Sequence, residues 1–288
     1  MSAPTNGEAG RESSLGAPTR RIRIDGADIV YRELGVDRGS APVLVALPQL
    51  GANLDGWDPE VVDPLAEDRR VVLIGYRGVG GSTGAVRPSF EEAADDVVAV
   101  IAALGLGRVD LLGQSMGGMV AQAVLERSPE VVDRVVLASA GPRGGPGLTA
   151  MTGVMVRTIL RGVLTATDPT ALLFFTRSAA GRQAAREYAA RLKRRRADRD
   201  RAVGPGVFRA QLRAVERWGA ASAPAGRLPH PALILHGDSD RLVPPWNVEP
   251  LRRRFDDALA VVLSDSGHGA VAQNRREVVE TVRDFLRR

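Results

Sequence analysis

A serine between two glycines is the first feature of this sequence that could do chemistry. The segment Gly113–Gly117 (GQSMG) follows the apolar run Val109–Leu112 and leads directly into a helical pattern. A tight turn from strand to helix leaves little room, so the positions two before and two after Ser115 must be small. Such a turn would hold the hydroxyl outward, and the Met116 amide at the helix N-terminus would face a developing oxyanion. A glycine-rich loop with an incidental serine is the alternative.

A serine hydroxyl is a poor nucleophile at neutral pH, so it needs a base beside it and a group that orients the base. His268 lies in a predicted loop between the last strand and the last helix. A carboxylate follows the predicted strand Ala232–Leu235, and parallel strands bring both segments to the same edge of the sheet. The sequence therefore predicts Ser115 as nucleophile, His268 as base and Asp240 as the orienting acid.

Other residues compete for these roles. Asp238 and Asp240 both follow the strand; Asp240 is favoured because it stands three residues before the Val243-Pro244 pair, and Asp238 could cap the turn. Of the remaining histidines, His230 lies between two prolines and His236 closes a strand whose end is expected to be buried. A histidine in a loop or an aspartate in a turn is common. Here, however, each residue follows a predicted strand, and the order is serine, acid and histidine, which favours a triad.

Composition narrows the class of protein. The 288 residues include no cysteine and three histidines, which excludes disulfides and argues against thiolate or histidine metal sites. We expect no metal and no cofactor. Residues 1–20 lack the apolar run of a signal peptide and predict a disordered tail. Since no segment has the roughly 20 apolar residues of a bilayer span, we expect a cytoplasmic protein without membrane insertion.

Apolar runs alternate with helical periodicity, a pattern typical of parallel strands joined by crossover helices. Two runs flank Asp25-Gly26 as an expected edge hairpin, giving a mostly parallel sheet of about eight strands with helices on both faces. The expected strands are Arg21–Ile24, Ala27–Glu33, Ala41–Leu47, Arg70–Ile74, Val109–Leu112, Arg134–Ser139, Ala232–Leu235 and Leu259–Leu263. The expected helices outside any insertion span 58–67, 90–104, 116–127 and 273–287.

More than ninety residues separate the strands ending at Ser139 and beginning at Ala232. A loop of that length needs structure of its own, and helical stretches near 148–164, 168–179, 181–200 and 206–218 predict a lid. We therefore divide the chain into a tail (1–20), an α/β core (21–142 and 228–288) and a helical lid (143–227). The lid should roof a largely apolar cavity for a small molecule, with the side chains of Leu160, Leu164, Leu172, Phe174, Phe175 and Trp218.

The predicted lid is strongly basic, with 17 basic and 5 acidic residues between Arg143 and Arg227. The run Lys193–Arg196 could attract nucleic acid or anionic lipid, but without interleaved aromatic residues a solvated helix face is favoured and no nucleic-acid partner is expected. Arg157, Arg161 or Arg177 could select an anionic group on the substrate. The sequence leaves the oligomeric state open.

Together these motifs resemble the α/β-hydrolase superfamily, in particular its lidded bacterial esterases and cofactor-free haloperoxidases. The resemblance covers about residues 21–288: the GQSMG turn, Gly78–Ser82, an acid motif ending at Val243-Pro244, and Gly267-His268 followed by an apolar helix. It implies the triad Ser115, Asp240 and His268. A serine at the turn argues against the dehalogenases and epoxide hydrolases, which use aspartate there.

Two positions depart from the family pattern. The loop after the first parallel strand reads Pro48-Gln49-Leu50-Gly51, where the family has His-Gly, and proline has no amide hydrogen to donate. The resemblance then assigns Leu50 as the second oxyanion donor beside Met116. Gly75 stands where the family commonly has a structural aspartate.

The resemblance implies hydrolysis of an ester, lactone or similar acyl bond through an acyl-enzyme intermediate. Two alternatives stay open. The same triad could serve perhydrolase, haloperoxidase-like, lyase or cyclase chemistry in specialised metabolism, or the altered loop could have left a non-catalytic small-molecule binder.

Overall fold

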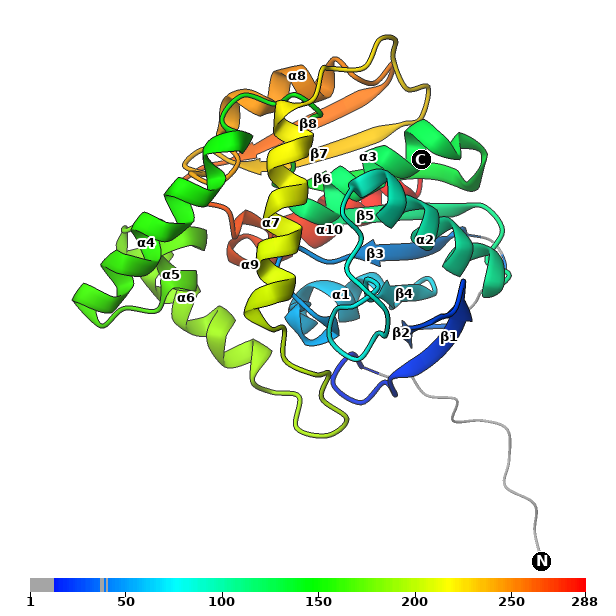
Figure 1. The fold of residues 1–288 in the computed structure, drawn as a ribbon, viewed down its shortest axis with the longest axis horizontal. Helices are drawn as coiled ribbons and strands as arrows, with labels where there is room; N and C mark the ends of the chain where they lie inside the picture. Colours follow the sequence, from blue (N-terminus) through cyan, green and yellow to red (C-terminus); the bar gives the residue numbers. More distant parts are fainter. Residues whose placement is uncertain (1–12, 37–38, 40) are drawn as a thin grey trace, which may run out of the picture.

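An eight-stranded sheet forms the centre of the structure, a computed structural model that describes residues 13–36, 39 and 41–288 (Figure 1). Its strand order is β1-β2-β4-β3-β5-β6-β7-β8. β1 and β2 are antiparallel to their neighbours, and all other pairs are parallel, which confirms the predicted sheet. The strands are β1 (Arg20–Ile24), β2 (Ala27–Leu34), β3 (Val43–Leu47), β4 (Val71–Ile74), β5 (Val109–Gln114), β6 (Val132–Ala138), β7 (Ala232–Gly237) and β8 (Ala258–Leu263).

The expected edge hairpin joins β1 to β2 through a two-residue turn. Asp25 and Gly26 both have positive φ, 41° and 76°, as a turn matching the twist of the two strands requires. Ile24 and Ala27 face each other across the turn.

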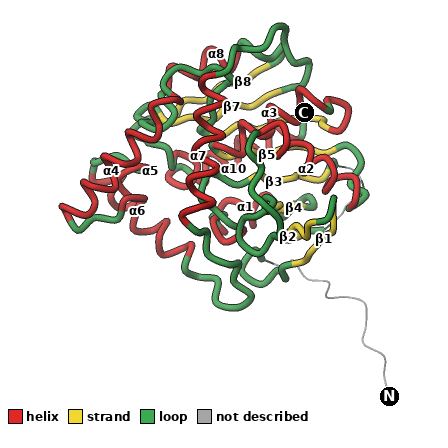
Figure 2. Tube along the Cα trace, in the orientation of Figure 1, coloured by secondary structure: helices red, strands yellow, loops and turns green. Residues whose placement is uncertain are grey.

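Helices cover both faces of the sheet, because alternate residues of each buried strand point to opposite sides (Figure 2). In β4, Val72 and Ile74 face one apolar core and Val71 and Leu73 face the other. The first core includes side chains of α2 (Phe90–Ala103), α3 (Met116–Arg127) and α8 (Val248–Arg252). The second includes side chains of α1 (Pro59–Leu65), α9 (Ala270–Gln273) and α10 (Arg275–Leu286). Single-turn 3-10 helices lie at η1 (Leu54–Gly56), η2 (Pro129–Val131), η3 (Leu148–Ala150) and η4 (Pro245–Asn247).

Between β6 and β7 the chain forms an insertion, seen in Figure 1 beyond the carboxyl ends of the parallel strands. Its helices are α4 (Met151–Thr165), α5 (Pro169–Phe174), α6 (Ala179–Leu192) and α7 (Pro205–Ala220). We refer to them as the α4–α7 insertion. α5 is shorter than the expected helix 168–179, and α6 ends eight residues before the expected end at residue 200. The short helix α8 was not predicted.

Tertiary contacts explain why α6 stops early. Arg195, just past its end, is 4% exposed, and its guanidinium donates to the carbonyl oxygens of Ser14 (2.7 Å) and Ala17 (2.9 Å). Arg194 pairs with Glu60 at 2.9 Å. The interpretation of the run Lys193–Arg196 as a solvated helix face is therefore wrong at its centre, because two of its charges bind the core.

The same contacts shorten the predicted tail. Residues 1–12 lie outside the described residues, but Ser14 and Ala17 are buried, and the Ser13 hydroxyl donates to Asp63 at 2.6 Å. Arg20 already belongs to β1. The prediction of disorder through residue 20 is therefore wrong for the part that packs against Arg195.

Candidate active site

Ser115 occupies the turn between β5 and α3 in a strained conformation, with φ 53° and ψ −116°. Its amide donates to the Ala138 carbonyl of the neighbouring strand at 2.7 Å. A Cβ on Gly117 would lie 2.0 Å from the Leu47 oxygen, and one on Gly113 would lie 2.5 Å from the Gly117 oxygen. The turn therefore requires glycine at both positions, as the steric argument from the sequence predicts.

The three residues predicted as a triad lie in direct contact. The Nε2 atom of His268 is 2.8 Å from the Ser115 hydroxyl oxygen, and its Nδ1 atom is 2.7 Å from Oδ2 of Asp240. All three side chains are buried, at 3–4% exposed. A neutral imidazole can therefore donate from Nδ1 to the carboxylate while Nε2 accepts from the serine.

The two competing aspartates have different neighbours. Oδ1 of Asp240 accepts the amides of Leu242 (2.9 Å) and Val243 (3.0 Å), which leaves Oδ2 for His268. Asp238 accepts the amides of Asp265 and Ser266, each at 3.1 Å. Asp238 thus holds the loop that carries the histidine, rather than capping its own turn.

Sequence reasoning did not assign a role to His236, which supports the acid. Its Nε2 atom lies 2.8 Å from the Val243 carbonyl oxygen and 3.6 Å from Oδ2 of Asp240. Burial lowers the pKa of His236, and the nearby His268 adds to this, so the ring stays neutral and donates to the carbonyl. His230 instead binds the Pro129 carbonyl at 2.9 Å and precedes β7, whereas Asp240 follows the other end of that strand.

Two further contacts hold His268 and were also missed. The Ser139 hydroxyl donates to the His268 carbonyl at 3.1 Å, and the Phe174 ring meets the imidazole edge-on with centroids 5.3 Å apart. Phe174 belongs to α5, so the α4–α7 insertion takes part in shaping the site. No local pattern marks either residue, because both contacts join segments far apart in the chain.

The two predicted oxyanion donors, Met116 and Leu50, are held in place differently, the first by a helix and the second by side-chain contacts to its loop. Met116 is the first residue of α3, so its amide has no acceptor within its own helix. Leu50 is half-buried in a turn braced on both sides: Gly51 donates to Oε1 of Gln211 at 2.8 Å, and the Tyr76 hydroxyl donates to the Pro48 carbonyl at 3.2 Å. The contact with Gln211 comes from α7 of the insertion, so the loop depends on a distant segment.

The other departures from the family pattern have local explanations. Gln49 is buried and lines the same cavity as Tyr188, whose pKa burial raises to about 12. A Cβ at Gly75 would lie 2.9 Å from a Val30 methyl carbon and 3.2 Å from the Ser82 hydroxyl oxygen. An aspartate would not fit there without movement of the neighbouring strand.

Comparison with known families identifies this arrangement. A family model described as alpha/beta hydrolase fold matches residues 42–274, most of the chain. The chain belongs to the α/β-hydrolase family.

Relatives of this α/β-hydrolase span several activities. A Pseudomonas 2-hydroxymuconate semialdehyde hydrolase is 29% identical, with 99% of this chain and 97% of that protein covered. A Rhizobium rhizogenes protein named as a carbamate hydrolase, RutD, is 32% identical, but the match spans only 39% of this chain and 43% of the relative. The chain spans less than half the length of the RutD relatives that it matches, whereas the match to the semialdehyde hydrolase extends over nearly the whole of both chains.

Solved structures show the same fold. An alpha/beta hydrolase fold protein from Chitinophaga pinensis has a TM-score of 0.89 at 26% identity, with 96% of this chain and 99% of that chain covered. The enol-lactonase from Burkholderia xenovorans has a TM-score of 0.72 at 24% identity, with 93% and 100% covered. The likeness to the enol-lactonase supports the fold alone.

A cavity of about 470 Å³ lies between the Leu50 loop and the α4–α7 insertion of this α/β-hydrolase. Phe174 lines this cavity and also contacts the His268 ring, so the cavity adjoins the triad. Leu50, the predicted second oxyanion donor, lines it as well. Of the six predicted roof residues, only Phe174 and Phe175 line it; Leu160 and Leu164 face solvent. Its lining is mainly apolar but includes four charged residues, Asp55, Asp168, Lys193 and Arg199.

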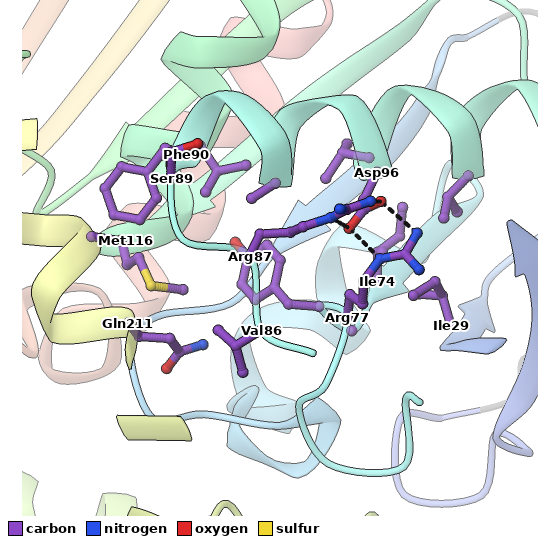
Figure 3. Close-up of a pocket in the computed structure, with 17 residues that line it drawn as sticks. Ile29, Ile74, Arg77, Val86, Arg87, Ser89, Phe90, Asp96, Met116 and Gln211 are labelled. Carbon is purple, nitrogen blue, oxygen red and sulfur yellow. Dashed lines mark hydrogen bonds and ion pairs between the residues drawn. The ribbon is translucent and has the colours of Figure 1, made fainter. Parts of the chain in front are cut away.

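Figure 3 shows a second cavity, of about 30 Å³, which Met116 and Gln211 also line. One wall is an ion cluster in which the Asp96 carboxylate accepts from both Arg77 and Arg87. Burial acts to raise the Asp96 pKa, but the two guanidinium groups outweigh it and the pKa is lowered. A space this small holds about a single water, so the larger cavity is the candidate substrate site.

Arg157, Arg161 and Arg177 are not among the described residues that line the larger cavity. The hypothesis that they select an anionic substrate group therefore has no support from the geometry. In the described residues, no cluster of three His, Cys, Asp or Glu side chains could hold a metal ion. None of the described helices combines the length and apolarity of a bilayer span.

Proposed function

We propose that this hydrolase cleaves a carboxylic ester or lactone through an acyl-enzyme intermediate. The observation that supports this most strongly is the buried hydrogen-bond chain from Ser115 through His268 to Asp240, with both links shorter than 3 Å. A serine activated in this way attacks acyl carbons, and the strained turn holds its hydroxyl in one direction.

In the first half-reaction, Nε2 of His268 accepts the hydroxyl proton while Oγ of Ser115 bonds to the acyl carbon. The carbonyl oxygen becomes an oxyanion, which we assign to the amides of Met116 and Leu50. The intermediate collapses as the bond to the alcohol oxygen breaks, and His268 returns the proton to that oxygen. A water molecule then repeats the sequence, releasing the acid and restoring Ser115.

Asp240 has an orienting role in this scheme. Its carboxylate keeps the Nδ1 proton in place, so Nε2 is free to act as the base, and it stabilises the imidazolium that forms. Because two backbone amides engage its other oxygen, the carboxylate has one orientation toward His268. His236 contributes as a positioning residue by binding the Val243 carbonyl in the same loop.

The substrate class follows from the cavity. Its size suits a small ligand, and its mainly apolar lining favours an apolar acyl or alcohol group with a polar end beside the charged residues. We further propose that residues 143–227 act as the lid over a core formed by 21–142 and 228–288. The hydrogen bonds that link Ser115, His268 and Asp240 support an enzyme over the non-catalytic binder.

Labelling with a fluorophosphonate probe tests the proposal, because only an activated serine reacts quickly with it. The wild-type protein should be labelled at Ser115, and Ser115→Ala should abolish labelling and reduce the turnover of short-chain esters by about 10⁴-fold or more. Ser222→Ala, at an exposed serine, is the matched control and should behave like the wild type. Esterase activity that survives in Ser115→Ala would show that another residue is the nucleophile.

A further inference from the structure

Helix α4 carries a continuous row of exposed apolar side chains. At 3.6 residues per turn they lie within an arc of roughly 140° on the helix surface. We call this row the α4 stripe: Val156 (50% exposed), Ile159 (41%), Leu160 (58%), Val163 (75%) and Leu164 (86%). The side of α4 that packs on the protein carries Met151, Met155 and Gly162 instead.

The α4 stripe is unusual for this molecule. The other large apolar side chains exposed in the described residues are dispersed: Val36, Trp246, Leu259 and Val262. Single exposed apolar residues need no explanation, whereas a contiguous apolar surface marks an interaction site. In Figure 1, α4 also projects with α5 from the body of the protein, so the stripe is open to a large partner.

Positive charge borders the stripe. Arg157 and Arg161 follow one another at i and i+4 along one flank, both are exposed, and neither forms an ion pair with any described residue. Arg241 lies close by: burial lowers its pKa, and the charges of Arg177 and Arg161 lower it further. α4 contains no carboxylate, and the nearest in sequence, Asp168, caps α5 by accepting the Thr170 amide.

We propose that the α4 stripe docks this hydrolase on a negatively charged lipid–water interface. An amphipathic helix with apolar and basic faces lies in the plane of such an interface, its apolar side chains in the acyl region and its cations at the headgroups. Arginine suits the boundary because its methylene stem lies on apolar surface while its charge stays in water. This inference goes beyond the proposed function and does not depend on it.

A second copy of the chain fits the stripe less well. If two stripes met around a two-fold axis, Arg157 and Arg161 of each copy would approach those of the other, with no carboxylate on either α4 to neutralise them. An anionic lipid surface is complementary to the same charges. The charge pattern therefore favours the lipid surface over self-association.

Vesicle co-sedimentation tests this with the full chain. We expect binding to phosphatidylcholine vesicles that contain about 30 mol% phosphatidylglycerol, little binding to phosphatidylcholine alone, and a loss of binding as salt increases. Arg157→Gln/Arg161→Gln should weaken partitioning about thirtyfold, at about tenfold per 1.4 kcal/mol. Val163→Ser/Leu164→Ser should weaken it about tenfold without changing the thermal unfolding midpoint.

Arg209→Gln/Arg213→Gln is the matched control, since it removes two exposed arginines from α7 and leaves the α4 stripe intact. This variant should keep most of the wild-type partitioning. Equal losses in the α4 and α7 arginine variants would overturn the proposal in favour of a diffuse charge effect. The proposal also fails if the wild-type protein does not bind anionic vesicles. It fails as well if the wild-type protein is a dimer and Val163→Ser/Leu164→Ser converts it to a monomer.

Discussion

The Nε2 atom of His268 lies 2.8 Å from the hydroxyl oxygen of Ser115, although 153 positions separate the two residues in the chain. β5 and β8 carry them to the same edge of the sheet, and the next contact, from His268 to Asp240, crosses between the segments after β8 and β7. The catalytic proposal depends on these two distances.

Substitution of the two aspartates after β7 should affect different properties: activity for Asp240 and stability for Asp238. Asp240→Asn should reduce kcat by about 10⁴-fold, because the amide favours the wrong imidazole tautomer. Asp238→Ala should lower the free energy of unfolding by about 1 kcal/mol, through two amides that lose their acceptor, with a much smaller loss of kcat. Steady-state ester kinetics and urea denaturation distinguish the effects, and a larger kcat loss in Asp238→Ala would reverse the assignment.

Gln211→Leu should impair turnover without large loss of stability. Its side-chain oxygen accepts the Gly51 amide at 2.8 Å, so the substitution frees the loop that carries the proposed Leu50 donor. We expect kcat to fall about tenfold, less than the complete loss of an oxyanion donor, with KM nearly unchanged. Gln183→Leu, at an exposed glutamine of α6, is the control. A change in KM alone would indicate that Gln211 acts on substrate binding instead.

Gly117→Ala tests the steric argument for the turn. The new methyl group would lie 2.0 Å from the Leu47 oxygen, a backbone atom, so β3 or α3 must move. We expect a loss of about 1–3 kcal/mol in the free energy of unfolding, together with reduced activity. Gly204→Ala is the control, since its Cβ would meet no atom within 4 Å, and it should stay within about 0.5 kcal/mol of the wild type.

The buried ion pair of Arg191 and Asp58 should couple the α4–α7 insertion to the core. The two side chains lie 2.7 Å apart and are 3% and 5% exposed. Arg191→Met would leave a carboxylate buried without its partner, at a cost of about 3–5 kcal/mol. Arg191→Met/Asp58→Leu should recover much of this, as measured by thermal unfolding. If the double variant were as unstable as the single one, the carboxylate would not be the cause.

His236 should make stability depend on pH. Burial holds its folded pKa below the value of 6.5 that it has when exposed, so below about pH 6.5 the unfolded chain binds a proton that the folded chain does not. This contribution to the free energy of unfolding is complete above that pH and declines as pH falls, by up to about 1.4 kcal/mol per unit. His236→Gln, which cannot titrate, should show a shallower slope between pH 6.5 and the folded pKa. An unchanged slope would mean that other groups determine the acid sensitivity.

Much of the site could be predicted because its requirements are local. A strand, a serine between glycines and a helix specify the turn within a few residues. The acid and the histidine each follow a strand that can be recognised in the sequence by its apolar run. The choice of Asp240 over Asp238 also came from a short motif. His236, Ser139 and Gln211 were missed, because their roles arise from contacts with backbone atoms elsewhere in the fold.

The insertion was predicted less well, since its helices take their ends and faces from tertiary contacts. Helical periodicity located them, but α6 ends where Arg195 turns into the core and binds the Ser14 and Ala17 carbonyls. Leu160 and Leu164 were expected over the cavity, yet they face solvent. Apolar spacing along a helix identifies an apolar face without revealing what that face meets.

The sequence by itself determined the sheet, the order of serine, acid and histidine, and the glycines around Ser115, because strand periodicity and steric exclusion act over a few residues. Only the tertiary structure decided that the Leu50 loop rests on Gln211, that Asp58 holds Arg191, and that the α4 stripe stays uncovered. Those outcomes depend on how distant segments pack together.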